Sequence, residues 1–424
     1  MQNLLLALSK NRYISSIYSG YMYVYPFMIL GYFFAMLLNL PLLERDSIFF
    51  NEYYFNMIMK YRYFILQIYY ISSGFFSLWL CFGIGYFLGK SYKLDAPKSG
   101  LISVFSMLLF FSFVKFYVKD GFVNTIYFIN YEFLSPKNSL TAIFISFCSV
   151  GFYNFFYNKG LFIKLPDSIP KSVAKNMEIV FPIFFMAIFM LILNVYFVKI
   201  FNISMADFFA NIILLEIAKY FNNIFVIIFV IFLVNFIWYH GVNGYNIVFP
   251  VVNILTFVNL SLNVENFIYN KNYTNVFVPG FLETFVFLGG VGSTIGLSFL
   301  MIFSKNSEIK RHGEMSLIPS LFNINEPVMF GVPIVKNKIF LIPFFLMPII
   351  NACVAFYLIK MGYISYPIAF LPFWIPSIIA VFFVTLDVNS MVFVLSMAVI
   401  SALMYYPFFF IYTRRLKNNE KNKN

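Results

Sequence analysis

The sequence predicts an all-α, polytopic membrane protein with about ten transmembrane helices. Of its 424 residues, 61% are hydrophobic and only 11% are charged, and the mean hydropathy is +0.83. A soluble globular domain has about 45–50% apolar and about 25% charged residues. The apolar residues also gather in long runs, which is typical of membrane spans and not of a soluble domain.

The candidate spans are apolar runs close to the roughly 20 residues that cross a bilayer core. In chain order they cover residues 22–43, 63–89, 101–118, 140–157, 179–201, 224–238, 281–303, 339–359, 364–384 and 391–412. Several sequences within or beside these runs are rich in glycine, proline and amide residues. At those places we expect re-entrant hairpins instead of simple spans.

Basic residues predict the orientation of the spans. The formal net charge is +12, but the lysines and arginines lie in short loops and not in one patch. Membrane topology therefore explains them better than nucleic-acid binding does. Lys10 and Arg12 precede the first span, and Arg414, Arg415 and Lys417 follow the last. By the positive-inside rule, both termini are cytoplasmic and the number of spans is even.

A polar segment at residues 160–178 separates an earlier half of the chain from a later half. In the sequence GLFIKLPDSIPKSVAKNME, Pro166 and Pro170 flank a turn, and the part after Pro170 is typical of a short amphipathic helix. We therefore expect a transmembrane part over 1–178, a second over 179–413, and a cytoplasmic tail over 414–424.

The distribution of cysteine and histidine predicts neither a metal nor an organic cofactor. Cys81, Cys148 and Cys353 are scattered within apolar segments, and no His, Cys, Asp and Glu cluster has ligand spacing. The same scatter argues against a disulfide framework.

The stretch IWYHGVNGYNIV, residues 237–248, places His240, Asn243 and Asn246 at membrane depth. Irregular backbone is tolerated there only where protein buries it or where it lines a watery cavity. A re-entrant hairpin satisfies this requirement. The alternative is a surface loop with an interfacial Trp238.

The stretch GGVGSTIGL, residues 289–297, is expected to serve close packing. It lacks the strand context and the spacing of a dinucleotide-binding fingerprint. Gly292 and Gly296 instead form a small-xxx-small pair, which is typical of close helix packing in membranes.

The stretch FNINEPVMFGVPIV, residues 322–335, places the carboxylate of Glu326 in an apolar setting. Three prolines interrupt this region, namely Pro319, Pro327 and Pro333. They cannot share one regular helix, so we expect a broken, cavity-lining segment. An intramembrane acid is by default a functional-site hypothesis. The alternative is a cytoplasmic loop that follows the basic residues 310–311.

This stretch closely resembles the signature of the membrane-embedded IIC components of the bacterial phosphoenolpyruvate-dependent sugar phosphotransferase system, in the lactose/cellobiose/diacetylchitobiose family. Other segments resemble the family in the same order: YFLGKSYKLDAPKSGLIS at 86–103, IKLPDSIPKSVAKN at 163–176, WYHGVNG, GGVGSTIGL, and ALMYYPFFFIY at 402–412. The resemblance implies a homodimer of ten-span protomers in the bacterial cytoplasmic (inner) membrane. It also implies re-entrant hairpins and places dimerisation and sugar-binding elements within 179–413.

The resemblance further implies a sugar site. Glu326, supported by Asn325 and Asn323, would bind sugar hydroxyls near the position to be phosphorylated. A carboxylate accepts several such hydrogen bonds, and these strengthen where water is excluded. Glu326 is also the candidate general base for the attacking hydroxyl.

The chain departs from the family's pattern at two places in this site. Asn243 in WYHGVNG stands where the family has a sugar-binding histidine, and His240 is the candidate substitute. A packed or interfacial His240 is the alternative. PFWIP at 372–376 replaces the family's P-W-T-x-P, so Phe373 or Trp374 would stack on a sugar ring. These changes leave the identity of the sugar open.

The family's partners are soluble proteins. A IIB protein carries a phosphocysteine and is itself charged by a IIA protein that carries a phosphohistidine. The polar ends of this sequence are too short to contain either, so we expect the chain to support phosphoryl transfer together with IIB in trans. Two other functions stay open: a proton-coupled secondary transporter of small polar solutes, and a degenerate paralogue that binds sugar without phosphorylating it.

Overall fold

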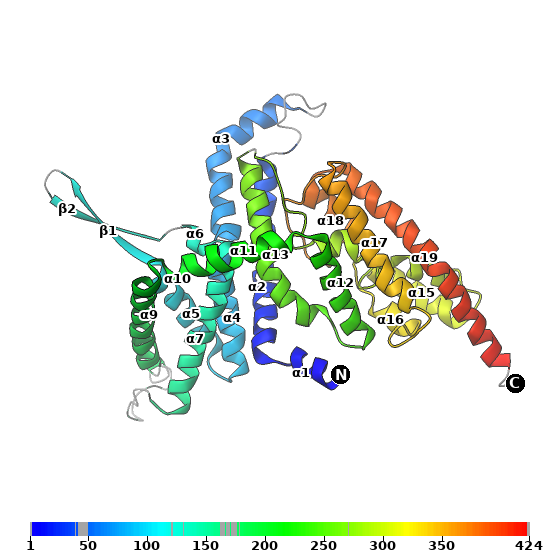
Figure 1. The fold of residues 1–424 in the computed structure, drawn as a ribbon, viewed down its shortest axis with the longest axis horizontal. Helices are drawn as coiled ribbons and strands as arrows, with labels where there is room; N and C mark the ends of the chain where they lie inside the picture. Colours follow the sequence, from blue (N-terminus) through cyan, green and yellow to red (C-terminus); the bar gives the residue numbers. More distant parts are fainter. Residues whose placement is uncertain are drawn as a thin grey trace. The chain divides into compact units, whose positions relative to one another are not determined.

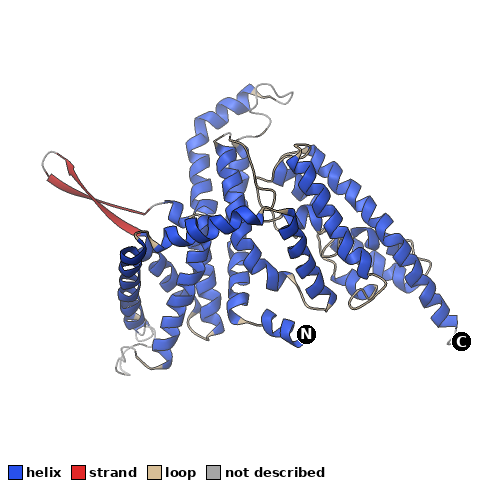
Figure 2. Cartoon of the chain, viewed as in Figure 1, coloured by secondary structure: helices blue, strands red, loops and turns tan. Residues whose placement is uncertain are grey.

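The computed structural model describes residues 2–38, 40, 50–119, 122–129, 131–161, 166, 170, 176–177, 179–269 and 271–421. These residues are helical apart from connecting turns and one two-stranded hairpin (Figure 1 and Figure 2). The all-α class expected from composition and hydropathy is therefore confirmed. The hairpin joins β1 (Ser112–Lys119) to β2 (Phe122–Ile129) in antiparallel register, from Ser112 opposite Ile129 to Lys119 opposite Phe122.

Within the described residues, seven helices are long and apolar enough to cross a membrane. They are Arg12–Leu37, Glu52–Ser91, Pro136–Asn158, Val180–Phe201, Tyr245–Ile268, Leu341–Lys360 and Val388–Asn418. A helix pair bent by 87°, Met205–Phe221 with Ile224–Tyr239, gives an eighth if it is one broken span. The remaining apolar segments are shorter helices or irregular backbone.

The chain forms two compact units that alternate along the sequence. The N-terminal unit comprises Lys10–Gly31 and Tyr63–Lys219, and the C-terminal unit comprises Met1–Ser9, Tyr32–Arg62 and Tyr220–Asn424. The division after residue 178 and the amphipathic helix beyond Pro170 stay predictions, since residues 171–175 and 178 lie outside the described part.

Small residues bring the helices of the N-terminal unit close together. Its elements are the first part of α2 (Arg12–Leu37), the end of α3 (Glu52–Tyr69), η2 (Tyr70–Gly74), α4 (Phe76–Ser91), α5 (Ala96–Phe111), the hairpin, α6 (Tyr131–Leu134), η3 (Pro136–Asn138), α7 (Ser139–Asn158), α9 (Val180–Phe201), α10 (Met205–Asp207), η4 (Phe208–Leu214) and most of α11 (Leu215–Phe221). Buried serines bond between its helices, as in the 2.8 Å contact between Ser103 Oγ and Ser149 Oγ. Serine hydroxyls satisfy one another here where lipid offers no partner.

The C-terminal unit holds a larger buried core. Its elements include α1 (Gln2–Ser9), α12 (Ile224–Tyr239), α13 (Tyr245–Ile268), η5 (Leu282–Val286), α14 (Ile295–Ile302), α15 (Ser307–Leu321), α16 (Glu326–Gly331), α17 (Leu341–Lys360), α18 (Ser377–Thr385) and α19 (Val388–Lys421). Helix α14 packs against α15 and α19, and α12 packs against α17. Fully buried aromatic rings, including Phe281, Phe285 and Phe344, fill the space between them.

Three of the predicted spans need correction. The run 101–118 is helical only to Phe111 and then enters strand β1. The run 281–303 is not one helix, because a five-residue π-helix and a series of turns precede α14. The run 364–384 starts with nonhelical backbone, and helix α18 begins only at Ser377. Helix α19 extends into the predicted tail as far as Lys421, and the cytoplasmic location of 414–424 stays a prediction.

One long helix was missed altogether. The sequence predicts a hairpin over 237–248 and no span after it, whereas α13 runs for 24 residues from Tyr245 to Ile268. The helix is apolar enough for a span, so this prediction is wrong. In the structure Asn259 and Asn263 are buried and bond to backbone carbonyls, so these amides are structural partners and not surface groups.

Candidate functional site

The candidate site is built on a buried segment of irregular backbone, residues 275–294, which we call the broken segment. Every residue in it is buried. Gly289, Gly290 and Gly292 have φ values of 77°, 99° and 86°, and Ser293 has 58°. Such left-handed conformations break a helix and favour glycine. Buried irregular backbone must find hydrogen-bond partners within the protein.

Side chains from α17 and α19 supply several of those partners. Asn351 Nδ2 donates to Val286 O at 2.8 Å and to Ser293 Oγ at 2.6 Å. From α19, Ser401 Oγ donates to Ser293 O at 2.6 Å and Tyr405 Oη donates to Gly292 O at 2.7 Å. These bonds hold the broken segment in one conformation.

The prediction of close helix packing is confirmed at Gly296, whereas Gly292 lies in the turn before α14 and packs closely from there. A Cβ added to Gly296 would lie 2.1 Å from Ala402 N and 2.5 Å from Ala402 Cα, so α14 packs directly on the α19 backbone. A Cβ added to Gly292 would lie 2.2 Å from the Phe344 ring. No side chain fits at either place without moving its neighbours.

Asn323 joins the FNINEPV stretch to two other segments. Its Oδ1 accepts hydrogen bonds from Gly289 N at 3.1 Å and Ser377 Oγ at 2.9 Å. Its Nδ2 donates to Phe373 O at 3.0 Å and to Glu283 O at 3.4 Å. The residue has φ of 59°, a left-handed conformation that asparagine tolerates better than most residues. The side chain thus ties the broken segment and the PFWIPS turn to one point.

Asn325 and Glu326 are adjacent but face different surroundings. Asn325 is 3% exposed, and its Nδ2 donates to Val291 O at 2.6 Å. Gly290 packs against it so closely that an added Cβ would meet Asn325 Cβ at 2.6 Å. Glu326 begins the short helix α16 and is exposed. The expected break around the three prolines is confirmed, because Pro319 lies in the last turn of α15, Pro327 lies in the first turn of α16 and Pro333 lies in the turn after it.

Aromatic side chains flank the segment that Asn323 holds. Phe373 and Trp374 form an edge-to-face pair with centroids 5.2 Å apart, and Trp374 is 44% exposed. The Tyr245 ring lies 6.4 Å from Phe373 and 5.7 Å from Phe287. The start of α13 therefore meets the PFWIP turn through aromatic contacts.

The WYHGVNG stretch forms a tight turn between α12 and α13. Asn243 is half-buried and its Oδ1 accepts a hydrogen bond from Tyr245 N at 3.0 Å. His240 is also half-buried, and its Nδ1 bonds to Phe236 O at 2.8 Å while its ring packs 4.6 Å from the Phe236 ring. The described contacts of His240 are thus those of a packed side chain at the end of α12.

Sequence reasoning missed two polar residues in this region. Ser377 Oγ bonds to Asn323 and also to Glu283 O at 3.2 Å. Glu283 is 7% exposed, and its Oε2 has no hydrogen-bond partner among the described residues. A single acid in the apolar run 276–288 was the available signal for Glu283.

The arrangement combines an exposed carboxylate, amides and aromatic rings on a rigid frame. Such groups suit a hydroxyl-rich, neutral ligand, which offers hydrogen-bond donors to a carboxylate and an apolar face to an aromatic ring. Within the described residues, no group of three or more His, Cys, Asp or Glu side chains is arranged to hold a metal ion.

Comparisons with known proteins agree on one family. The family model described as Phosphotransferase system, EIIC matches residues 19–348. The chain is 27% identical to the "PTS system oligo-beta-mannoside-specific EIIC component" of Bacillus subtilis, covering 95% of this chain and 90% of that one. It is 25% identical to the "PTS system lactose-specific EIICB component" of Staphylococcus epidermidis, covering 97% of this chain and 69% of that one.

A solved structure has the same fold. It is the crystal structure of the transporter ChbC, the IIC component from the N,N'-diacetylchitobiose-specific phosphotransferase system. The match has a TM-score of 0.89 at 23% sequence identity, and it covers 99% of this chain and 98% of the other.

Proposed function

The chain belongs to the phosphotransferase system EIIC family and is a sugar permease of that system, and we propose that its cargo is a disaccharide. The proposed class is that of cellobiose, diacetylchitobiose and lactose. Relatives are named for lactose, oligo-beta-mannoside and lichenan, and the solved structure for N,N'-diacetylchitobiose. All these names refer to sugars of two or more units.

One observation carries the proposal: the side chain of Asn323, in the FNINEPV stretch, is hydrogen-bonded to both the broken segment and the PFWIPS turn. Through Gly289 N, Glu283 O, Phe373 O and Ser377 Oγ, this amide uses both its donors and its acceptor within the protein. Glu326 lies three residues along the chain, and Trp374 lies next to Phe373. We therefore assign Asn323 a positioning role, and Glu326 with Phe373 and Trp374 the contact with sugar.

Glu326 is the proposed catalytic residue. It would accept hydrogen bonds from sugar hydroxyls and take the proton from the hydroxyl that attacks the phosphoryl group. Asn325, buried beneath it and bonded to Val291 O, would fix the start of α16. Phosphorylation gives the sugar charge, which weakens its binding to a site for a neutral ligand and prevents its return through the hydrocarbon core.

Asn243 is the proposed substitute for the family's histidine. Its Oδ1 accepts a hydrogen bond from Tyr245 N, and its Nδ2 has no hydrogen-bond partner among the described residues, so that amide N–H can donate to a sugar oxygen. His240 is the weaker candidate, because its Nδ1 is bonded to Phe236 O and only Nε2 is left for a ligand.

The phosphoryl donor in this proposal is phospho-IIB, charged in turn by IIA. The lactose-specific relative is named as an EIICB component and is longer than this chain, which covers 69% of it. We propose that a separate IIB serves this chain in trans, and that the chain works as a homodimer in the bacterial cytoplasmic membrane with both termini in the cytoplasm.

The test is uptake of labelled diacetylchitobiose, cellobiose and lactose into vesicles that contain the chain, with and without a matching IIB and the general phosphotransferase proteins. We expect accumulation of sugar phosphate only when IIB is present. Accumulation of unmodified sugar that collapses with the proton gradient would instead identify a secondary transporter. Binding without either form of uptake would identify a sugar-binding paralogue.

A further inference from the structure

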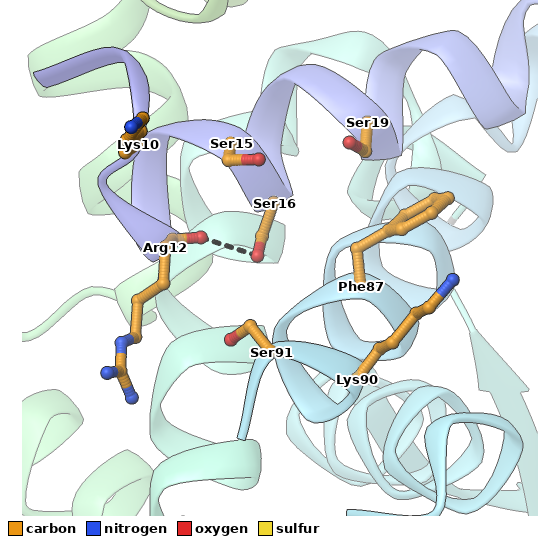
Figure 3. A pocket seen from close by; sticks show the side chains of 8 residues that line it. All are labelled: Lys10, Arg12, Ser15, Ser16, Ser19, Phe87, Lys90 and Ser91. Atoms are coloured by element: carbon orange, nitrogen blue, oxygen red, sulfur yellow. Dashed lines mark hydrogen bonds between the residues drawn. The ribbon is translucent and has the colours of Figure 1, made fainter. Parts of the chain in front are cut away.

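The N-terminal unit contains a basic pocket that the sugar permease function does not use. It is a cavity of about 430 Å³ between the first turns of α2 and the last turn of α4 (Figure 3). The two helices touch just beyond it, where a Cβ on Gly20 would lie 2.7 Å from Ile84 and a Cβ on Gly83 would lie 3.1 Å from Gly20 Cα. The cavity opens where the helices separate from this contact.

Three cations line the pocket, and its lining includes no acid. They are Lys10, Arg12 and Lys90. The Arg12 guanidinium lies over the Tyr92 ring, 4.6 Å from its centroid, which limits where it can move. The nearest acid along the chain, Asp95, is 4.0 Å from Lys98 and is not a lining residue. The pocket is therefore positively charged.

Serine hydroxyls complete the lining, and two of them are available as donors. Figure 3 shows Ser15 and Ser19 along α2, one helical turn apart. Neither hydroxyl has a hydrogen-bond partner among the described residues. Ser16 and Ser91 already donate to Arg12 O at 2.6 Å and Leu88 O at 2.7 Å. Free O–H groups beside ammonium and guanidinium groups match the oxygens of a phosphate.

An apolar strip continues from the pocket along the same two helices. Phe87 is part of the lining, and its ring lies 6.1 Å from that of Tyr23. Tyr23 stacks on Tyr86, and Phe27 stacks on Trp79 farther along α2. Tyr23 and Phe27 are 48% and 41% exposed. An anionic group with a hydrocarbon tail would meet cations at one end and aromatic rings at the other.

We propose that this pocket binds the head group of an anionic phospholipid. Lys10, Arg12 and Lys90 pair with the phosphodiester, Ser15 and Ser19 donate to its oxygens, and the acyl chains lie along Tyr23 and Phe27. Basic pockets between membrane helices on the cytoplasmic side bind such head groups. The positive-inside rule predicts that side for Lys10 and Arg12, which precede the first span. The inference needs neither sugar nor IIB, so it stands or falls independently of the proposed cargo.

The experiment measures lipid binding to the purified full chain by native mass spectrometry. Dioleoyl phosphatidylglycerol, dioleoyl phosphatidylcholine and inorganic phosphate are the three probes. The test variant is Lys10→Gln with Lys90→Gln. The matched control is Lys93→Gln with Lys159→Gln, which removes two exposed cations outside the pocket. A further variant, Ser15→Ala with Ser19→Ala, keeps every charge.

We expect phosphatidylglycerol to bind in preference to phosphatidylcholine, and the test variant to bind it roughly thirtyfold more weakly, on the scale for two basic side chains at an anionic surface. The serine variant should bind several-fold more weakly, and the control should bind like the wild type. Equal loss in test and control variants, or no preference between the lipids, would overturn the proposal. Tight binding of inorganic phosphate that displaces phosphatidylglycerol would also overturn it, in favour of a soluble phosphate site.

Discussion

Neighbouring polar residues in the FNINEPV stretch have different tasks. Asn323 and Asn325 direct their amides into the protein and bond to carbonyls of the broken segment and the PFWIPS turn, whereas Glu326 is exposed at the start of α16. The amides therefore stabilise the frame and the carboxylate is left for a ligand. Substitutions at Asn323 and at Glu326 should therefore differ in their effect on stability.

Glu326→Gln should lose sugar binding and keep stability. Removing a hydrogen bond to a charged group costs about 1.5–3 kcal/mol, which weakens binding about 10- to 150-fold. The melting temperature should stay close to that of the wild type because the side chain is exposed. Isothermal titration with the transported disaccharide measures the first quantity, and a thermal melt in detergent measures the second.

Glu314→Gln is the matched control, since Glu314 is an exposed acid on α15 of the same unit. It should bind sugar like the wild type. If both variants bound sugar normally, Glu326 would be a surface residue and its role in the site would be withdrawn.

Asn323→Ala should lower stability and sugar binding together. The substitution leaves Gly289 N and the carbonyls of Phe373 and Glu283 without their partner, at about 1–3 kcal/mol for each buried group that finds no other. A loss of about 2 kcal/mol corresponds to a melting temperature lower by roughly 4–8 °C.

Two further variants separate the causes of that loss. Asn323→Gly keeps the left-handed backbone accessible but removes the bonds, and Asn323→Asp keeps the acceptor but removes the donors. We expect glycine to melt above alanine and aspartate to bind sugar more weakly than the wild type. A melting temperature unchanged in all three would show that Asn323 does not hold the segments together.

At the scale of the element, hydropathy predicted the regular helices well and the irregular ones poorly. The runs 140–157, 179–201, 224–238 and 339–359 match α7, α9, α12 and α17 to within two residues at each end. A uniform apolar helix needs only its own backbone bonds, so its sequence is sufficient to identify it.

The broken segment could not be predicted in the same way. Residues 281–303 are apolar enough for a span, but their backbone is satisfied by Asn323, Asn351 and Ser401 from distant parts of the chain. A window of hydropathy does not contain these long-range bonds. By contrast, α13 is apolar enough to be identified as a span, and its asparagines bond to other segments without preventing this. The FNINEPV stretch was identified because its prolines and Glu326 are local signals, whereas the links to Ser377 and Glu283 are not.

Gly296→Ala tests the packing of α14 on α19. The added methyl group would lie 2.1 Å from Ala402 N and 2.5 Å from Ala402 Cα, and backbone atoms cannot rotate away as a side chain can. Overpacking of this kind costs about 1–3 kcal/mol or more, so the variant should melt lower than the wild type.

Gly151→Ala is the control, because it lies in helix α7 and a Cβ there meets no atom within 4 Å. Alanine should stabilise that helix by about 0.5–1 kcal/mol. Equal effects of the two substitutions on the melting temperature would contradict close contact between α14 and α19.

At the scale of the whole molecule, the two compact units contain different candidate binding sites. Each candidate sugar-site residue lies in the C-terminal unit, and each residue that lines the basic pocket lies in the N-terminal unit. Both units are assembled from separate stretches of chain. Hydropathy reflects only local composition. The boundaries of these units depend on contacts between distant segments, so hydropathy does not predict them.

Membrane orientation is the property of the whole molecule that charge alone predicts. Single cysteines placed at Asn11 and Asn418 should be protected from a membrane-impermeant maleimide in intact cells and should react after the membrane is opened. Glu52 is the exposed first residue of α3 and lies between the first two predicted spans, on the side opposite the termini, so a cysteine there should react in both conditions. The native Cys81 is buried, but Cys148 and Cys353 are only partly so and are replaced by serine in the background chain.

Labelling at position 418 in intact cells, with none at position 52, would reverse the orientation and move the basic pocket away from the cytoplasmic leaflet. Its proposed lipid partner depends on that side, because anionic head groups attract basic segments most strongly at the cytoplasmic surface.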